Sequence, residues 1–386
     1  MHKSFNFKDK RFVVYGLGLT GQSVVKFLKK NKAKSIFTWD DKFKNSEFKK
    51  KKLLECLKFD DHIIISPGVN VNKSKFKKLL IVNKRKFLSD IDLFFLKYNA
   101  KRTVMITGTN GKSTTCSILS HVLKKNKIRS TLVGNIGTPI LKVKFSKKNI
   151  YIIEASSFQL EYSKYIKPYC AALLNITDDH LDWHGTKKKY IRSKFKIFEN
   201  QTNSDLAFIK DINLRRIYKK RKLLGKLKLI KKNLITPNNL NNKYLKLEAN
   251  KDNISFAYSI SKIFKIKKKK FVKSLDSFKG LPHRHEIFFN TRNCTFINDS
   301  KATSFEAAKY ALNSNDNIIW ILGGLPKEKD KFFVKKYRGK IIKAYIIGKR
   351  PNYFVKQLKN SIKFEVNRNL NSVIYKVFKS LNNKKT

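Results

Sequence analysis

A glycine-rich loop between a β-rich run and a helical pattern constrains the fold of this chain more than any other feature. The β-rich run Thr103–Thr107 leads into GTNGKST at 108–114, and a helical pattern follows through Lys124. In such a loop the backbone N–H groups surround phosphate oxygens, the lysine neutralises their charge, and the next hydroxyl can bind Mg²⁺. Ile106 stands where the full motif has its first glycine, but the order of strand, loop and helix is the required one. The sequence therefore predicts an ATP-binding α/β domain whose contacts to ATP include Asn110, Gly111, Lys112, Ser113 and Thr114.

Polar residues also follow two later β-rich runs. Glu154 ends the run 149–154, and the string TDDHLD at 177–182 follows the run 171–175. Because parallel strands bring their carboxyl ends to one edge of a sheet, we expect Glu154 and His180 to face the ligand side of the domain. Glu154 can then reach a metal ion that the phosphate loop holds. The alternatives are a carboxylate that only caps a helix and a histidine with a purely structural role.

The N-terminal segment carries a second glycine loop. A β-rich run, Arg11–Tyr15, precedes Gly16-x-Gly18-x-x-Gly21, and Asp40 stands close to the acidic position that follows the second strand of a dinucleotide-binding unit. A helix N-terminus after such a turn favours a pyrophosphate. The loop can serve any diphosphate, so another diphosphate ligand, NAD and an unliganded tight turn are all open.

The order of these runs predicts the fold class α/β. Strand patterns at 35–39, 62–65, 131–133, 317–322 and 343–347, a further strand ending at Ile297 and a helix over 304–312 complete the pattern. A helical pattern is predicted over 255–278, whereas the lysine- and asparagine-rich stretch 200–250 supports no assignment. We expect three consecutive α/β domains, 1–98, 99–280 and 281–386, each with ligands at the carboxyl ends of its strands.

Composition excludes several classes of protein. Of the 386 residues, 87 are Lys or Arg and 27 are Asp or Glu, so the formal net charge is +60. This charge fits either a surface selected for polyanions or a general compositional drift towards lysine. Four scattered cysteines without a CxxC pair argue against a disulfide scaffold or a zinc module. The sequence has no apolar run of the ~18 residues that a membrane helix needs and no signal peptide pattern, which predicts a soluble, cytoplasmic protein without membrane insertion.

Taken in order, the motifs resemble those of the Mur ligase family of cell-wall synthesis. They are GLGLTG at 16–21, SPG at 66–68, GTNGKST at 108–114, GNIG at 134–137, EASSFQL at 154–160, NITDDHLD at 175–182, YIRSK at 190–194, GLPHR at 280–284, INDSKAT at 297–303 and LGG at 322–324. The resemblance implies a Rossmann-like first domain, an ATPase-like central domain and a Rossmann-like third domain without its last elements. It also implies the activity of the branch that adds D-glutamate to UDP-N-acetylmuramoyl-L-alanine, with ATP and two Mg²⁺ ions, through an acyl phosphate.

The resemblance implies a role for each matching residue. The UDP part of the substrate would meet Leu19, Thr20, Asp40 and Gly68. The remainder of that substrate would meet Asn135, Ser157, Gln159 and His180. The nucleotide site would be completed by Asn253, Arg284 and Asp299, and D-glutamate would meet Lys301, Thr303 and Lys327. One Mg²⁺ would be held by Ser113 and Glu154, and the second by His180 and by Lys194 as a carbamate; the catalytic set would be Lys112, His180, Lys194 and Lys301.

Two departures from the family pattern qualify these expectations. Ala249 replaces the histidine of a His-Asn-x-x-Asn string in which Asn250 and Asn253 are kept. The sequence also ends at Thr386, before the final strand, Ser-Pro loop, phenylalanine and helix of the family. The resemblance then predicts a monomer, without a specific nucleic-acid partner, that binds nucleotide well and ligates D-glutamate poorly. The competing interpretations are a folylpolyglutamate synthase-like ligase and an ATPase that binds polyanions.

Overall fold

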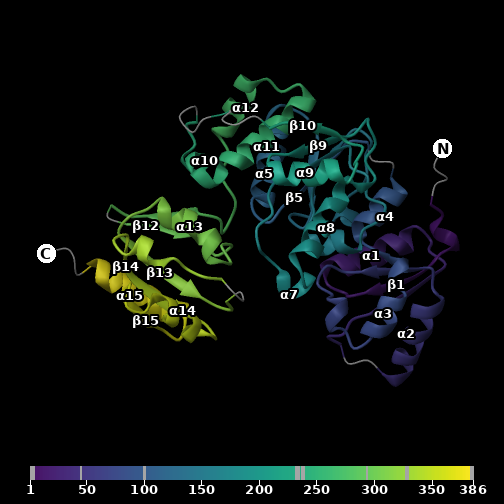
Figure 1. Cartoon of the computed structure of the whole chain (residues 1–386), viewed down its shortest axis with the longest axis horizontal. Helices are drawn as coiled ribbons and strands as arrows, with labels where there is room; N and C mark the ends of the chain where they lie inside the picture. Colours follow the sequence, from purple (N-terminus) through teal and green to yellow (C-terminus); the bar gives the residue numbers. More distant parts are fainter. Residues whose placement is uncertain are drawn as a thin grey trace. The chain divides into compact units, whose positions relative to one another are not determined.

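The computed structural model describes residues 5–43, 46–98, 101–230, 235, 240–292, 294–326 and 330–382. The chain divides into two compact units, Met1–Asn242 with Asn250–Phe278, and Lys243–Ala249 with Lys279–Thr386 (Figure 1). Both units are α/β, which confirms the predicted fold class. The finer division into domains at residues 98 and 280 stays a prediction. None of the described helices is both long and apolar enough to cross a membrane.

The first sheet of the larger unit is parallel, with strand order β2-β1-β3-β4. Its strands are β1 (Arg11–Tyr15), β2 (Ser35–Trp39), β3 (His62–Ile65) and β4 (Phe87–Leu88). Its helices are α1 (Leu19–Lys30), α2 (Glu47–Phe59), α3 (Lys77–Val82) and α4 (Asp90–Lys97). The bounds of the first three strands confirm the prediction. Alternate residues of β1 enter two different hydrophobic cores, one on each face of the sheet, which is why this run is apolar from Phe12 to Tyr15.

The second sheet of this unit is also parallel, with strand order β10-β9-β8-β5-β7-β6. Its strands are β5 (Thr103–Thr107), β6 (Ser130–Gly134), β7 (Ile150–Glu154), β8 (Cys170–Leu173), β9 (Leu206–Ile209) and β10 (Lys226–Lys228). Its helices are α5 (Lys112–Lys125), α6 (Ser157–Tyr162), α7 (Leu181–His184), α8 (Lys187–Glu199), α9 (Ile212–Lys220), α11 (Lys251–Ser261) and α12 (Lys268–Leu275). Strands β9 and β10 and helix α9 lie in the stretch that the sequence left unassigned.

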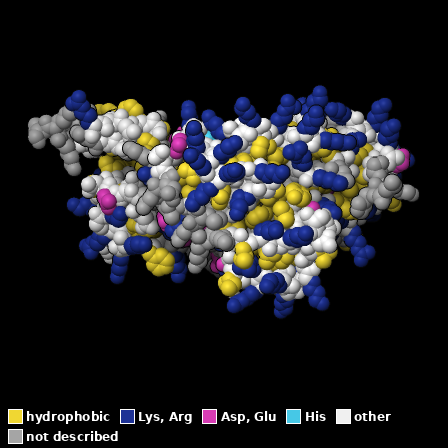
Figure 2. Space-filling view, turned by 90° about the horizontal axis from the view of Figure 1, so that it is seen from above, with side chains coloured by type: hydrophobic (Ala, Val, Ile, Leu, Met, Phe, Trp, Pro, Cys, Tyr) yellow, Lys and Arg dark blue, Asp and Glu magenta, His cyan; other side chains and the backbone are white. Residues whose placement is uncertain are grey.

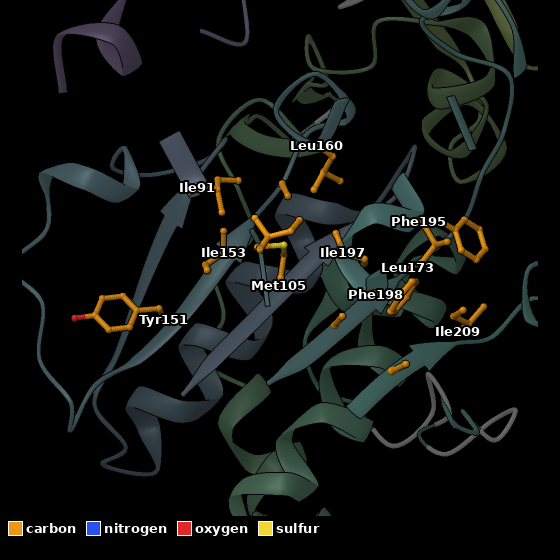
Figure 3. Close-up of a cluster of buried hydrophobic side chains, with 14 of the residues drawn as sticks. Ile91, Met105, Tyr151, Ile153, Leu160, Leu173, Phe195, Ile197, Phe198 and Ile209 are labelled. Atoms are coloured by element: carbon orange, nitrogen blue, oxygen red, sulfur yellow. The ribbon is translucent and has the colours of Figure 1, made fainter. Parts of the chain in front are cut away.

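The core beneath this sheet joins neighbouring strands to the helices that cover them (Figure 3). The strands contribute Met105, Tyr151, Ile153, Leu173 and Ile209, and the helices contribute Ile91, Leu160, Phe195, Ile197 and Phe198. The single helical pattern predicted over 255–278 is wrong. This stretch instead forms two helices, α11 and α12, with a short 3₁₀ turn between them. The helices are separate because Lys265 adopts φ +59°, which an α-helix cannot accommodate.

The smaller unit contains two further sheets. An antiparallel pair, β11 (Glu286–Asn290) and β12 (Thr295–Asn298), precedes a parallel sheet of β13 (Ile318–Gly323), β14 (Ile341–Ile347) and β15 (Phe364–Val366). Its helices are α10 (Lys243–Lys246), α13 (Phe305–Asn313), α14 (Pro351–Leu358) and α15 (Leu370–Asn382). The predicted strands at 317–322 and 343–347 and the predicted helix at 304–312 are confirmed. Short 3₁₀ turns occur at Phe7–Asp9, Val71–Lys73, Lys84–Lys86, Ile140–Lys142, Glu248–Asn250, Lys262–Phe264 and Val334–Tyr337.

Two buried carboxylates attach α4 to the second sheet. Asp92 completes a capping box with Ser89 and also accepts hydrogen bonds from the backbone N–H groups of Lys164 and Tyr165, at 2.8 and 2.7 Å. Asp90, which is equally buried, accepts one hydrogen bond from the side chain of Gln159 at 3.3 Å. The larger unit is therefore held together by buried polar contacts as well as by its cores.

We expect Asp90→Asn to remove a pH dependence of stability between about pH 4 and 6. Burial raises the pKa of Asp90 from 3.8 to about 6, so the folded chain holds a proton that the unfolded chain has lost. The free energy of unfolding should then fall as the pH rises through this window, by about 3 kcal/mol for one such group. Asparagine keeps an acceptor for Gln159. Urea unfolding of both proteins across the window measures the difference, and a difference that does not vary with pH would contradict the prediction.

Candidate active site

The order of the central strands brings three loops of the second sheet together. Strand β5 lies between β7 and β8, and all three run parallel. The phosphate loop after β5 is therefore flanked on one side by Glu154, the last residue of β7, and on the other by the segment that begins at Asn175 after β8. This is the sheet edge at which open α/β sheets bind ligands.

Hydrogen bonds from both sides hold the phosphate loop. The side chain of Asn175 accepts a hydrogen bond from the backbone N–H of Asn110 at 2.9 Å and donates one to its carbonyl oxygen at 3.1 Å. The hydroxyl of Thr109 pairs with that of Tyr190 at 3.0 Å. Lys112 donates from Nζ to the carbonyl oxygens of Gly108 and Thr109, at 2.9 and 2.8 Å. Asn175 was not predicted as a positioning residue. Its position just after β8, the strand next to β5, is the sequence signal that could have indicated this role.

Gly111 is the point at which the loop turns into α5. It has φ +83°, and a Cβ there would lie 2.2 Å from Oδ1 of Asn253. Asn253 also accepts a hydrogen bond from the Thr115 hydroxyl at 3.2 Å and donates one to Asn250 at 3.2 Å. The structure thus places Asn253 directly against the phosphate loop.

We expect Gly111→Ala to weaken nucleotide binding by roughly tenfold or more, because a side chain at positive φ is strained and the new methyl group collides with Asn253. Calorimetric titration with a non-hydrolysable ATP analogue measures the affinity. Gly339→Ala is the matched control, since a Cβ at Gly339 meets nothing within 4 Å. Equal affinities of the two variants would argue against this role of Gly111.

Lys194 is buried at the base of the site. Only 1% of its surface is exposed, although it belongs to α8, whose other lysines are mostly at the surface. Its Nζ donates to the carbonyl oxygen of Gly108 at 2.8 Å and lies 4.6 Å from the centre of the Tyr190 ring. Burial, and then the charge of nearby Lys112, lower the pKa of Lys194 well below its usual value. Burial at this position therefore disfavours the charged form of the amine.

Glu154 is fully buried beside the loop. One carboxylate oxygen accepts a hydrogen bond from Nδ2 of Asn135 at 2.7 Å, while the other, Oε2, has no hydrogen-bond partner among the described residues. An unpartnered carboxylate oxygen next to a phosphate loop fits a hard divalent cation, which needs only one or two carboxylates when phosphates and waters supply the rest. Within the described ranges no group of three or more His, Cys, Asp or Glu forms a metal site, so phosphate oxygens would have to share in holding the cation.

His180 lies at the start of α7. It adopts φ +54°, its backbone N–H donates to Oδ1 of Asp179 at 2.9 Å, and its ring packs 4.8 Å from the ring of Phe158. These contacts hold an imidazole that is 38% exposed at the rim of the site.

A pocket collects several of these side chains. It is lined by Lys112, Asn135, Ser156, Ser157, Phe158, His180, Tyr190 and Lys194. Five of these eight were predicted from the sequence: Lys112, Asn135, Ser157, His180 and Lys194. Sequence reasoning missed the other three, although Ser156 and Phe158 lie within EASSFQL and Tyr190 begins YIRSK. Gln159, which was predicted with them, does not line this pocket; its side chain accepts a hydrogen bond from the Ser156 backbone and donates one to Asp90.

A second buried histidine adjoins this pocket. Nε2 of His184 lies 3.0 Å from the Ser157 hydroxyl, whereas its Nδ1 has no hydrogen-bond partner among the described residues. Burial, followed by the charge of Lys194, lowers the pKa of His184 to about 4. The sequence analysis did not single out this residue.

The N-terminal glycine loop is closed by its neighbours. Asp40 accepts a hydrogen bond from the backbone N–H of Leu17 at 2.7 Å, and the Ser66 hydroxyl donates to the carbonyl oxygen of Gly16 at 2.7 Å. A Cβ at Gly21 would lie 1.8 Å from that same carbonyl oxygen, so only glycine fits there. The predicted substrate residues at this edge are Leu19, 71% exposed, Thr20 in the first turn of α1, and exposed Gly68.

The smaller unit holds the other predicted residues in a cluster of its own. Asp299 accepts a hydrogen bond from the backbone N–H of His285 at 2.9 Å, and burial raises its pKa against the opposing charge of Arg284. The backbone N–H of Lys301 donates to the carbonyl oxygen of His283 at 3.0 Å. The Thr303 N–H donates to the carbonyl oxygen of Lys301 at 3.1 Å, and Lys327 lies outside the described residues.

The basic side chains do not gather over one element on the face shown in Figure 2. Lys and Arg are spread across that face among apolar side chains, and acidic side chains are few. On this face the distribution fits a general use of lysine at the surface better than a confined polyanion site.

Comparisons with known proteins agree with this site. Residues 106–276 match the Mur ligase middle domain. The UDP-N-acetylmuramoylalanine–D-glutamate ligase of Rickettsia prowazekii is 36% identical, over 94% of this chain and 88% of that protein. The protein of the same name from Francisella philomiragia is 32% identical, over 94% and 87%.

Solved structures show the same fold. The MurF ligase of Thermotoga maritima in complex with ADP superimposes with a TM-score of 0.54 and 16% identity, over 97% of each chain. The UDP-N-acetylmuramate–alanine ligase of the same organism gives 0.54 and 16%, over 93% of this chain and 90% of that one. The chain described here belongs to the Mur ligase family, in the group of sequences named UDP-N-acetylmuramoylalanine–D-glutamate ligase.

Proposed function

We propose that this chain adds D-glutamate to UDP-N-acetylmuramoyl-L-alanine with the energy of ATP, a step in the synthesis of peptidoglycan precursors. The observation that supports this most directly is the pocket in which Lys112 and Lys194 adjoin Ser157 beside the phosphate loop. The ammonium group of Lys112 and the Ser157 hydroxyl can receive an anionic acyl group next to a bound triphosphate, and Lys194 lies beside them. The name of the relatives supplies the two substrates.

The reaction that this arrangement supports has two steps. The alanyl carboxylate attacks the γ-phosphorus of ATP and displaces ADP, which forms an acyl phosphate. The amine of D-glutamate then attacks the acyl carbon, the bond from that carbon to the phosphate oxygen breaks, and phosphate leaves as the nitrogen loses one proton and keeps its other N–H in the amide. Because each step concentrates negative charge, the backbone N–H groups of the phosphate loop and the ammonium group of Lys112 stabilise both transition states.

The donors around the loop fit two Mg²⁺ ions. Ser113 and Glu154 would hold one, and the buried Oε2 of Glu154, which has no partner among the described residues, supports this assignment. His180 and Lys194 would hold the other, with Lys194 as a carbamate. Bound Mg²⁺ supplies positive charge to the phosphate oxygens.

The resemblance implies a carbamate on Lys194, and a buried amine in its uncharged form can react to give one. An uncharged Nζ attacks the carbon of CO₂, the electrons of one C=O bond move to its oxygen, and the nitrogen releases a proton. The product is a carboxylate, which is an oxygen ligand for a hard cation, whereas an ammonium group would repel it. The burial of Lys194 and its lowered pKa support this modification.

We assign the remaining residues by the same resemblance. Asn110, Gly111, Thr114, Asn253, Arg284 and Asp299 serve the nucleotide, and Lys301, Thr303 and Lys327 serve D-glutamate. Leu19, Thr20, Asp40 and Gly68 serve the UDP moiety, while Asn135, Ser157, Gln159 and His180 serve the rest of that substrate. We also propose three domains with boundaries near residues 98 and 280, and a monomer that acts in the cytoplasm without a specific nucleic-acid partner.

The test is phosphate release from ATP by the purified full chain with Mg²⁺ and UDP-N-acetylmuramoyl-L-alanine. Release that requires D-glutamate, and that L-glutamate does not replace, supports the proposal. Release with a folate substrate and L-glutamate, or release stimulated by nucleic acid alone, would contradict it.

A further inference from the structure

His184 holds a pocket serine from a position that the substrate does not reach directly. The imidazole is 4% exposed, ends α7, and contacts the Ser157 hydroxyl at the first residue of α6, which is 3% exposed. The rings of Phe158, Trp183 and Tyr190 surround it, with ring centres 5.9, 4.5 and 5.1 Å away. The ring nitrogen that lies next to the Ser157 hydroxyl, at 3.0 Å, is Nε2.

The surroundings of the two ring nitrogens determine where the proton lies. A neutral imidazole carries a single N–H, on either Nδ1 or Nε2. With the proton on Nδ1, a buried donor would have no acceptor, since Nδ1 has no partner among the described residues. With the proton on Nε2, the N–H donates to Ser157, and only a weaker acceptor is left unpaired. The structure therefore favours the tautomer with Nε2–H.

This tautomer sets the direction of the serine hydroxyl. An oxygen that accepts from His184 keeps its own O–H to donate elsewhere. Ser157 lines the pocket together with Lys112, whose Nζ is also a donor. Two donors beside the phosphate loop fit a ligand with anionic oxygens, such as a carboxylate or an acyl phosphate.

We propose that His184 is a positioning residue that presents the Ser157 hydroxyl as a hydrogen-bond donor to an anionic oxygen at the reacting end of the acyl substrate. The proposal rests on the ligase function proposed above, but the position of the proton on His184 does not. The two can therefore be tested separately.

The first experiment determines the tautomer without any turnover. Long-range ¹H–¹⁵N correlation spectra of the full chain labelled in histidine, with His184 assigned by the signals lost in His184→Gln, should show Nε2 protonated and Nδ1 unprotonated. A signal from Nδ1–H would overturn the proposal, even if the chain proves to be a ligase.

The second experiment measures coupling between the two residues. Ser157→Ala and His184→Phe should each lower kcat/KM for UDP-N-acetylmuramoyl-L-alanine by about 10- to 100-fold, the range expected for a hydrogen bond to a charged group. The double variant should lose little more than either single variant. His184→Gln, which keeps an N–H donor, should recover most of the loss. Additive losses, or no recovery with glutamine at unchanged melting temperature, would overturn the proposal.

His62 provides the matched control. It is also a largely buried histidine with one unpartnered ring nitrogen among the described residues, Nε2, and it packs against Phe5 and Phe12 on the first sheet. His62→Phe should leave kcat/KM unchanged, and a loss equal to that of His184→Phe would count against the proposal. If the wild-type chain shows no ligase turnover, the proposed function fails. The inference about His184 is then tested by the measured tautomer of its imidazole alone.

Discussion

Lys194→Met is expected to lower phosphate release in the presence of both substrates by about 100- to 1,000-fold, because it removes the amine on which the second cation site depends. Methionine has a similar length and no charge, so the buried space around residue 194 stays filled. The loss should appear mainly in kcat. Turnover within a few-fold of the wild type would contradict the role of Lys194.

Carbon dioxide provides an independent measurement of the same site. Wild-type protein prepared without CO₂ should regain activity when bicarbonate is added, and Lys194→Met should not respond. Lys196, two residues further along α8, is the control: its Nζ donates to the carbonyl oxygens of Glu161 and Ser163, away from the pocket. Lys196→Met should lower the melting temperature and leave kcat unchanged.

Glu154→Gln is expected to lower turnover by about 100-fold without lowering the stability of the fold. Glutamine keeps an acceptor for Asn135 but replaces the charged oxygen that would bind Mg²⁺. The fold should not be weakened, because a buried carboxylate with one unpartnered oxygen costs desolvation energy that an amide avoids in large part. Phosphate release measured against Mg²⁺ concentration, together with thermal unfolding of the ligand-free chain, tests both expectations.

Glu161→Gln is the matched control for this substitution. Glu161 belongs to α6, is partly exposed and pairs with Lys84 at 3.5 Å. Its replacement should change neither the Mg²⁺ dependence nor the turnover. If Glu154→Gln keeps the wild-type Mg²⁺ dependence, or if it unfolds at a clearly lower temperature, the assignment of Glu154 to the cation is wrong.

Local pattern was sufficient for the elements that carry the motifs. The bounds of β1, β2, β3 and β5 follow from short β-rich runs that end in glycine or polar turns. The phosphate loop and the position of Glu154 at the end of its strand follow from the same local information. A strand that is buried on both faces needs a continuous apolar run, and a loop with positive φ at Gly111 needs glycine there. Few other conformations suit such a short stretch of sequence.

The local sequence pattern did not predict contacts between residues that are far apart in the chain. The amide group of Gln159 donates to Asp90, which lies 69 residues away in the sequence. The edge strand β10 has the sequence Lys-Leu-Lys, which has no β-rich pattern of its own. It is defined by its parallel pairing with β9. The chain breaks at Lys265, between α11 and α12, and each of these helices buries its own apolar residues. The helical pattern alone does not indicate where such a break occurs.

The sequence by itself thus determined the class of fold and the phosphate loop, because these depend on local pattern, and its resemblance to the Mur ligase family indicated five of the eight residues that line the pocket. Only the tertiary structure decided that β5 lies between β7 and β8, that Lys194 is buried against Gly108, and that Nε2 of His184 lies next to the Ser157 hydroxyl. The physical reason is that strand order, burial and the partner of a ring nitrogen are properties of residues far apart in the chain, which meet only after folding.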